Sequence, residues 1–292
     1  MLRTETLETL ETLETLTTTG DWTQSEVPAA RTMHSAMVTQ VVQTMRAQFN
    51  EPLSLEDMAD MACLSPYYFS RVFRSITGIA PGEFLSALRL EAARRLLLTT
   101  SLSVTDICFE VGYSGLGSFT TRFTQLVGVP PRLLRHLASN TCIPTPELVN
   151  NAQQISRPAF AMDTRGVYGR VYTPRAFSGV IFIGLFAKPI PQGRPISCTK
   201  LTTPGPFHIA SVPPGQYYVL SAAFPFSENP HVYLLPGDSL MVGAQGPVHV
   251  SQAGISQPVE IHLHPARSTD PPIIAALPYI SSVAQQAGKN LQ

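Results

Sequence analysis

The sequence predicts a two-domain protein in which an all-α domain with two helix-turn-helix units is followed by an antiparallel β-sandwich. One pattern occurs twice between Leu53 and Leu134, and short apolar runs separated by proline and glycine begin at Gly166. A chain of 292 residues with 44% apolar and 14% charged residues has room for two domains. The predicted divisions are a low-complexity, disordered tail (1–35), the helical domain (36–138), a linker (139–165), the β-domain (166–266) and a C-terminal tail (267–292).

The repeated pattern is the main evidence for the helical domain. Its first copy runs from Leu53 to Pro81 and its second from Leu102 to Pro131. The copies are offset by 49 residues in their first half and by 50 from Phe69 and Phe119 onward, which places one extra residue in the second turn. A fixed period of this size indicates a repeated supersecondary unit.

Each copy is expected to fold as a helix, a tight turn and a second helix. In the first copy, Ser54 is a favoured N-cap, and Ser65 followed by Pro66 starts the second helix. Gly78 ends that helix. The buried stripe of this second helix is predicted to contain Phe69, Val72, Phe73 and Ile76, and the opposite stripe Tyr67, Ser70, Arg71 and Arg74. Such a helix, aromatic on one side and polar on the other, suits the major groove of DNA.

A long helix is expected between the copies, and another precedes them. Pro81 opens the helix from Gly82 to about Thr99, and Ala36 to Phe49 is amphipathic. Eighteen helical residues span ~27 Å. Successive major grooves on one face of B-DNA lie ~34 Å apart, so this spacer would present two recognition helices to adjacent grooves.

Residues Leu53 to Leu137 resemble the DNA-binding domain of AraC/XylS-type transcription regulators. The matching motifs are Ser65 to Phe73, Arg89 to Leu97, Val111-Gly112-Tyr113 and Gly128 to Pro131, and together they lie in about a third of the chain. The resemblance implies a transcription regulator that binds double-stranded DNA. Scattered cysteines favour a cytoplasmic protein, and no Ser-His-Asp spacing, Gly-rich phosphate loop or carboxylate pair stands out, so no catalytic residues, enzyme activity, cofactor or metal are expected. A contact with RNA polymerase or a small-molecule effector would fit that role. This family normally carries its effector domain before the DNA-binding part, and here the order is reversed.

The residues expected to bind DNA differ between the two copies. They are Tyr67, Ser70, Arg71 and Arg74 in the first recognition helix and Leu116, Gly117, Ser118, Thr121 and Arg122 in the second. Family members commonly carry an arginine two residues after the phenylalanine in both helices, but Thr121 occupies that position in the second. An arginine–guanine contact discriminates by ~1–3 kcal/mol, so the first helix is predicted to dominate base reading. Residues 67–140 carry eight arginines and four acidic residues, a net charge of +4.

The β-domain is predicted from apolar runs that recur every 8 to 12 residues. Residues Pro206 to Val219, with Pro213-Pro214-Gly215, resemble one hairpin of the transthyretin-like domains related to carboxypeptidase regulatory domains, which implies a non-catalytic accessory sandwich. The expected strands are Val167–Tyr172, Gly179–Ala187, Ile196–Leu201, Phe207–Val212, Gln216–Phe224, His231–Leu234, Ser239–Val242, Pro247–Val250 and Pro258–His264.

Several alternatives remain open at this point. The helical domain would serve as an adaptor if it bound a protein instead of DNA. His208, His231, His249, His262 and His264 lie on candidate strands, but a zinc site needs three or four convergent ligands. The aromatic side chains of the β-domain form either its core or the lining of an apolar effector pocket. The four cysteines (63, 108, 142 and 198) lack Cys-x-x-Cys spacing and are expected to be buried, reduced thiols, and neither a secretion signal nor a membrane span is expected.

Overall fold

The computed structural model describes residues 28–140, 166–210, 212–227, 231–235, 237, 239–255 and 257–276. The chain divides into two compact units, residues 1–37 and 38–292, and every contact discussed below lies within the second. The predictions for residues 1–27, for Cys142 and the rest of 141–165, and for residues 277–292 lie outside the described part of the chain.

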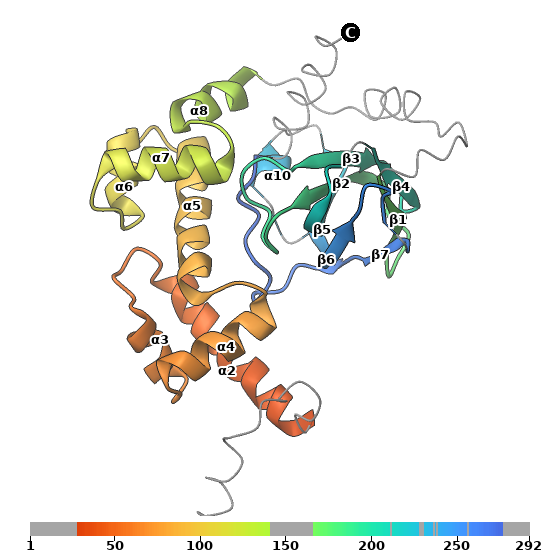
Figure 1. The fold of residues 1–292 in the computed structure, drawn as a ribbon. Helices are drawn as coiled ribbons and strands as arrows, with labels where there is room; N and C mark the ends of the chain where they lie inside the picture. The colour runs from red at the N-terminus through yellow and green to blue at the C-terminus, as the bar shows by residue number, and fades with distance from the viewer. Residues whose placement is uncertain are drawn as a thin grey trace, which may run out of the picture. The chain divides into compact units, whose positions relative to one another are not determined.

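The helical domain places one long helix between two helix-turn-helix units (Figure 1). The long helix is α5, which begins at Pro81 as predicted, whereas α2 begins at Pro28 and not at Ala36. Val38, Val41, Val42 and Met45 form the buried face of α2. The helices are α2 (Pro28–Ala47), α3 (Leu55–Met61), α4 (Pro66–Thr77), α5 (Pro81–Thr99), α6 (Val104–Glu110), α7 (Leu116–Val127) and α8 (Pro131–Asn140).

Equivalent capping boxes start the first helix of each repeat. The Ser54 hydroxyl accepts the N–H of Asp57 (3.1 Å), and the Asp57 carboxylate accepts the N–H of Ser54 (2.8 Å). Ser103 and Asp106 make the same pair of bonds at α6. These side chains therefore satisfy backbone donors that the first turn of a helix leaves unpaired.

Ser54→Ala is expected to lower the free energy of unfolding by about 1 kcal/mol, because it removes the acceptor for the Asp57 N–H. Urea unfolding followed by circular dichroism measures this change, and Ser101→Ala at an exposed position is the control. The Ser54 backbone N–H lowers the pKa of Asp57 below its ordinary 3.8. The Asp57 carboxylate therefore contributes fully to the free energy of unfolding above pH 3.8. This contribution is lost as the pH falls through the lower pKa that Asp57 has in the folded protein. Equal midpoints for Ser54→Ala and Ser101→Ala would contradict the capping role.

Aromatic clusters hold each helix-turn-helix unit together. The Phe73 ring lies 5.5 Å from Phe69 and meets Phe84 of α5 edge-on at 5.6 Å. In the second unit, Phe119 lies 5.3 Å from Tyr113 and 5.6 Å from Phe123. Phe69, Val72 and Phe73 are buried as predicted, whereas Ile76 is only half-buried.

The β-domain contains two sheets, which confirms the predicted order of an α-domain followed by a β-rich domain. One sheet has the strand order β4-β1-β7 and the other β3-β2-β5-β6-β8. The pairs are antiparallel except for β1 and β7, which run parallel. The strands are β1 (Val167–Tyr172), β2 (Gly179–Phe186), β3 (Ser197–Leu201), β4 (Pro206–Ile209), β5 (Gly215–Pro225), β6 (Met241–Val250), β7 (Val259–His262) and β8 (His264–Pro265).

Three local predictions in the β-domain were wrong. Residues His231–Leu234 form a short helix, α10, because four apolar and aromatic residues are too few for periodicity to separate helix from strand. The predicted strands Ser239–Val242 and Pro247–Val250 belong to a single strand, β6. The turn with Pro213-Pro214-Gly215 does not close a hairpin, since β4 pairs with β1 and β5 pairs with β2 and β6.

The sandwich has apolar packing on both faces of its larger sheet. The core between the sheets includes Ile183, Val219 and Ile261, and a second cluster on the opposite face includes Phe182, Phe224 and Ile273. Strand β2 is therefore buried at every position. Among the aromatic residues considered for a pocket, Tyr217 and Phe177 belong to or pack against the first cluster, and Phe226 packs against the second.

The structure shows how far the cysteines are buried and whether the histidines are grouped as metal ligands. Cys108 is buried as predicted, but Cys63 is exposed in the turn after α3 with a left-handed φ of 52°. In the described ranges, no group of three or more His, Cys, Asp or Glu side chains is placed to hold a metal ion. His262 stacks on Tyr172 with 4.9 Å between ring centroids. None of the helices in those ranges combines the length and hydropathy of a membrane span.

Candidate nucleic-acid interface

The first candidate recognition helix, α4, is fixed by a cap at each end. The Ser65 hydroxyl accepts the N–H of Tyr68 (3.4 Å), and Pro66 occupies the first turn. At the other end, Gly78 adopts φ +82° and its N–H donates to Arg74 O. A residue with a Cβ would be strained at this φ, so glycine suits the position.

The four predicted side chains of α4 gather on the face opposite the buried phenylalanines. Tyr67 is 76% exposed, Arg71 and Arg74 are exposed, and Ser70 is half-buried. Their spacing of three to four residues places them in neighbouring turns of one helix face. This face presents two guanidinium groups, a phenol and a hydroxyl, which are the kinds of group that proteins use to hydrogen-bond to DNA.

The second candidate recognition helix, α7, has a different N-terminus. Its N-cap is Gly115, which has no side chain to cap the helix, and the Ser118 hydroxyl instead donates to Gly115 O (2.8 Å). Leu116 is 40% exposed, and Gly117, Ser118 and Thr121 are exposed beside it. The open face of α7 is therefore less basic than that of α4.

Arg122, the arginine of α7, is partly engaged within the protein. Its Nε donates to the Ser86 hydroxyl of α5 at 2.9 Å. Because a guanidinium carries five N–H donors, this bond leaves donors for a further partner. Arg122 therefore joins the second helix-turn-helix unit to the central helix, a role that its sequence position did not suggest.

Two arginines outside α4 and α7 each bind two backbone carbonyl oxygens in the same way. In α5, Arg89 donates from Nε to Phe49 O (2.7 Å) and from Nη2 to Glu51 O (2.8 Å). In α8, Arg135 donates from Nε to Leu97 O (3.0 Å) and from Nη2 to Leu102 O (2.7 Å). Arg89 thus fixes the chain that leads into the first repeat, and Arg135 fixes the chain that leads into the second. The two arginines are 46 residues apart and so do not follow the 50-residue offset of the sequence repeat, and from the sequence they were counted as part of a basic surface.

Arg94 of α5 is buried and therefore does not contribute to the basic surface of the helical domain. It is 1% exposed, and its Nη1 donates to the carbonyl oxygens of Ile274 (3.0 Å) and Ala275 (3.3 Å). Its Nε and Nη2 have no hydrogen-bond partner among the described residues. Burial lowers the pKa of Arg94 to about 10, so the side chain remains charged at neutral pH.

Comparisons with known proteins identify the helical domain. A family model described as a helix-turn-helix domain matches residues 58–136. The HTH-type transcriptional activator AarP of Providencia stuartii is 31% identical over 101 residues, which are 35% of this chain and 75% of AarP. The chain belongs to the AraC-type helix-turn-helix family. The resemblance carried by the sequence motifs is therefore confirmed.

Other similar proteins also match about a third of this chain. The uncharacterized HTH-type transcriptional regulator YobQ of Bacillus subtilis is 36% identical over 86 residues, which are 30% of this chain and 36% of YobQ. The DNA-binding domain of AdpA, solved in complex with a target DNA, is 29% identical and covers 36% of this chain and 96% of that one, with a TM-score of 0.34. The chain spans 29% to 49% of the length of the first three curated relatives.

The β-domain satisfies backbone groups of this AraC-type domain directly. The last carbonyls of a helix lack partners within the helix. At the C-terminal end of α7, Leu126 O accepts the N–H of Gly193, and Val127 O accepts the N–H of Ala276 (3.1 Å). Lys188 also pairs with Glu83 of α5. The C-terminal end of α7 is therefore capped by the β2–β3 connection and by the segment that follows the predicted β-domain.

Proposed function

We propose that this protein is a sequence-specific transcription regulator that binds double-stranded DNA through α4 and α7, and that its β-domain regulates this binding. Arg71, Arg74, Tyr67 and Ser70 of α4 are the main base-reading and phosphate-contacting groups. Leu116, Gly117, Ser118, Thr121 and Arg122 of α7 make the weaker second contact. The protein acts without catalysis, cofactor or metal.

The exposed face of α4 is the observation that carries this proposal. It sets two exposed guanidinium groups on a helix that is capped at both ends and fixed by buried phenylalanines. A rigid helix of this kind can enter the major groove with little ordering of the protein on binding. The names of the relatives, which include a transcriptional activator, support the same role.

The length of α5 supports a reading of two adjacent grooves. Its 19 residues span ~28 Å, and one helix-turn-helix unit packs near each end (Figure 1). Adjacent major grooves on one face of DNA are ~34 Å apart, a distance of the same order. The recognition sequence is therefore expected to be asymmetric, with its stronger half under α4.

The regulatory role of the β-domain is supported by where it touches the helices. The hydrogen bonds of this domain and of the segment that follows it reach α7, Arg94 and Glu83 of α5, and Arg46 of α2. A change in the β-domain would then alter the position of α7 relative to α5. A small-molecule effector or RNA polymerase would act through this domain.

Arg71→Ala is expected to weaken specific DNA binding roughly 5- to 150-fold, the equivalent of losing one arginine–base contact of ~1–3 kcal/mol. Genome-fragment selection with the full chain first supplies the target sequence. Titration of that target at one stated salt concentration then measures the change, because phosphate contacts make all affinities salt-dependent. Leu116→Ala should have a smaller effect on sequence preference.

Arg175→Ala is the matched control, since it removes one exposed positive charge from the loop before β2. It should leave specific affinity within about twofold, as expected for a weak long-range charge effect. An equal loss of preference in Arg71→Ala and Leu116→Ala would contradict the dominance of α4. Selection that enriches no sequence would contradict the regulator itself and favour a protein-binding adaptor.

A further inference from the structure

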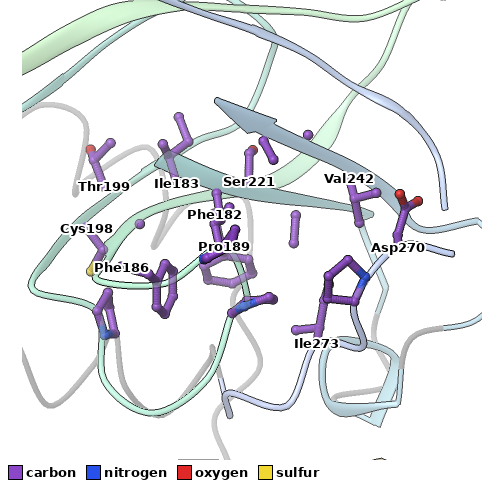
Figure 2. A pocket seen from close by; sticks show the side chains of 18 of the residues that line it. Phe182, Ile183, Phe186, Pro189, Cys198, Thr199, Ser221, Val242, Asp270 and Ile273 are labelled. Atoms are coloured by element: carbon purple, nitrogen blue, oxygen red, sulfur yellow. The ribbon is translucent and has the colours of Figure 1, made fainter. Parts of the chain in front are cut away.

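The larger sheet of the β-domain has a hollow on the face that points away from the other sheet. Its volume is about 100 Å³, and its floor includes Phe182, Phe186, Leu220 and Val242. Figure 2 shows Phe182 and Phe186 on this side of the sheet, whereas Ile183 and Ser221 point to the opposite side. The hollow therefore interrupts the second apolar cluster of the sandwich and is separate from its central core.

The hollow is covered by two segments of the chain that lie over the outer face of the larger sheet. These segments are the β2–β3 connection (residues 187–196) and residues 270–276. We call residues 270–276 the strap. The covering residues include three prolines (189, 191 and 195) together with Pro271 and Ile273.

The lining determines what kind of molecule fits. Apart from the Cys198 thiol, the polar side chains that line the hollow include His264 and Asp270, which lie 3.8 Å apart. These two side chains are 32% and 26% exposed, so they lie nearer the mouth than the buried Phe182. An enclosed apolar cavity of ~150 Å³ holds a benzene ring. The hollow, at about 100 Å³, is smaller but open on the side of His264 and Asp270, so a single ring would lie in it with one polar substituent at the mouth.

The strap connects the hollow to the DNA-binding domain within a few residues. The Ile273 side chain lines the hollow, while the carbonyls of Ile274 and Ala275 accept from Arg94. The N–H groups of Ile274 and Ala275 both donate to Pro191 O, at 3.1 and 3.0 Å, and Pro191 also lines the hollow. One residue further on, the Ala276 N–H donates to Val127 O of α7.

We propose that this hollow is an effector site for an uncharged, ring-sized apolar molecule with one hydroxyl or amino group. The ring contacts Phe182 and Phe186, and the polar group faces Asp270 and His264. A bound ring presses on Ile273 and Pro191, and the strap transmits the displacement to Arg94 and α7. The binding site is independent of DNA, whereas its regulatory meaning rests on the function proposed above.

The first test measures binding to the full chain without DNA. We expect p-cresol to bind saturably with one site per chain in calorimetry, and toluene to bind more weakly because it lacks the polar group. Benzoate, which matches the ring but carries a charge, should not bind. Absence of saturable binding by p-cresol, or equal binding of p-cresol and benzoate, would overturn the site.

Two variants locate the binding. Val242→Phe fills the hollow, and Ala244→Leu covers its mouth at an exposed position where added bulk does not endanger folding. Each should weaken p-cresol binding at least tenfold. Ala253→Leu makes the same change as Ala244→Leu in an exposed turn outside the hollow and should leave binding unchanged. Tight binding to both cavity variants would place the ligand elsewhere and refute the proposal.

Hydrogen exchange tests the connection to the helices. On saturation with p-cresol, the amides of Ile274, Ala275 and Ala276 are expected to change their exchange rates at least threefold, while the amide of Phe69 in α4 does not. Binding with unchanged exchange at all three amides would overturn the transmission through the strap. None of these measurements uses DNA, so their failure is distinguishable from a failure of the DNA-binding function.

Discussion

Phe73→Ala is expected to lower the free energy of unfolding by about 3–5 kcal/mol, the usual cost of truncating a buried phenylalanine. The Phe73 side chain is fully buried. Its ring contacts Phe69 within α4 and Phe84 of α5, so truncation opens a cavity where α4 meets α5. Urea unfolding followed by circular dichroism measures the change.

Tyr67→Ala is the control for the same helix, because it removes an aromatic ring that is 76% exposed. Its effect on stability should stay within about 0.5 kcal/mol. Phe123→Ala tests the second repeat, where the equivalent ring is also fully buried and lies 5.6 Å from Phe119. A loss below 1 kcal/mol in both phenylalanine variants would contradict the aromatic clusters as the basis of each unit.

The sequence was most informative where the structure depends on local interactions. The capping serines 54 and 65 and the terminal Gly78 marked helix ends that the structure places at those residues. Strand β1 has the predicted bounds, Val167–Tyr172. These elements carry their start and stop signals within a few residues, so a single sequence contains enough information to place them.

The errors arose where distant residues decide the outcome. Residues His231–Leu234 resembled a strand, yet Tyr233 packs on the second cluster of the larger sheet from a helix. Cys63 was expected to be buried within a helix, but that helix ends at Met61 and the cysteine lies in an exposed turn. No local pattern reports which face of a sheet or helix will be covered by a segment far away in the chain.

The same limit applies to the arginines of the helical domain. The sequence shows eight of them between residues 67 and 140 but not their partners, and the net charge of +4 over this range was interpreted as a basic surface for phosphate contacts. The structure assigns Arg89 and Arg135 to backbone carbonyls of the preceding segments. Arg94 lies under the strap. The accessible basic groups are therefore fewer, and they favour α4 over α7.

Arg94→Ala is expected to lower the free energy of unfolding by about 2–5 kcal/mol, because it removes the largest fully buried side chain in the described part of the chain and leaves a cavity under the strap. Arg94→Met retains much of the volume and removes a buried charge whose Nε and Nη2 lack partners among the described residues. Such replacements are often neutral, so the methionine variant should stay within about 1 kcal/mol of the parent.

The two variants should nevertheless share one effect. Both remove the donor to the carbonyls of Ile274 and Ala275, so the amides of residues 274–276 are expected to exchange faster in each. Hydrogen exchange and urea unfolding on the same samples separate the contribution of volume from that of the hydrogen bonds. Equal destabilisation by methionine and alanine would assign the stability to the hydrogen bonds. Unchanged exchange in both variants would show that Arg94 does not hold the strap, and would remove the route by which the β-domain is proposed to act on α7.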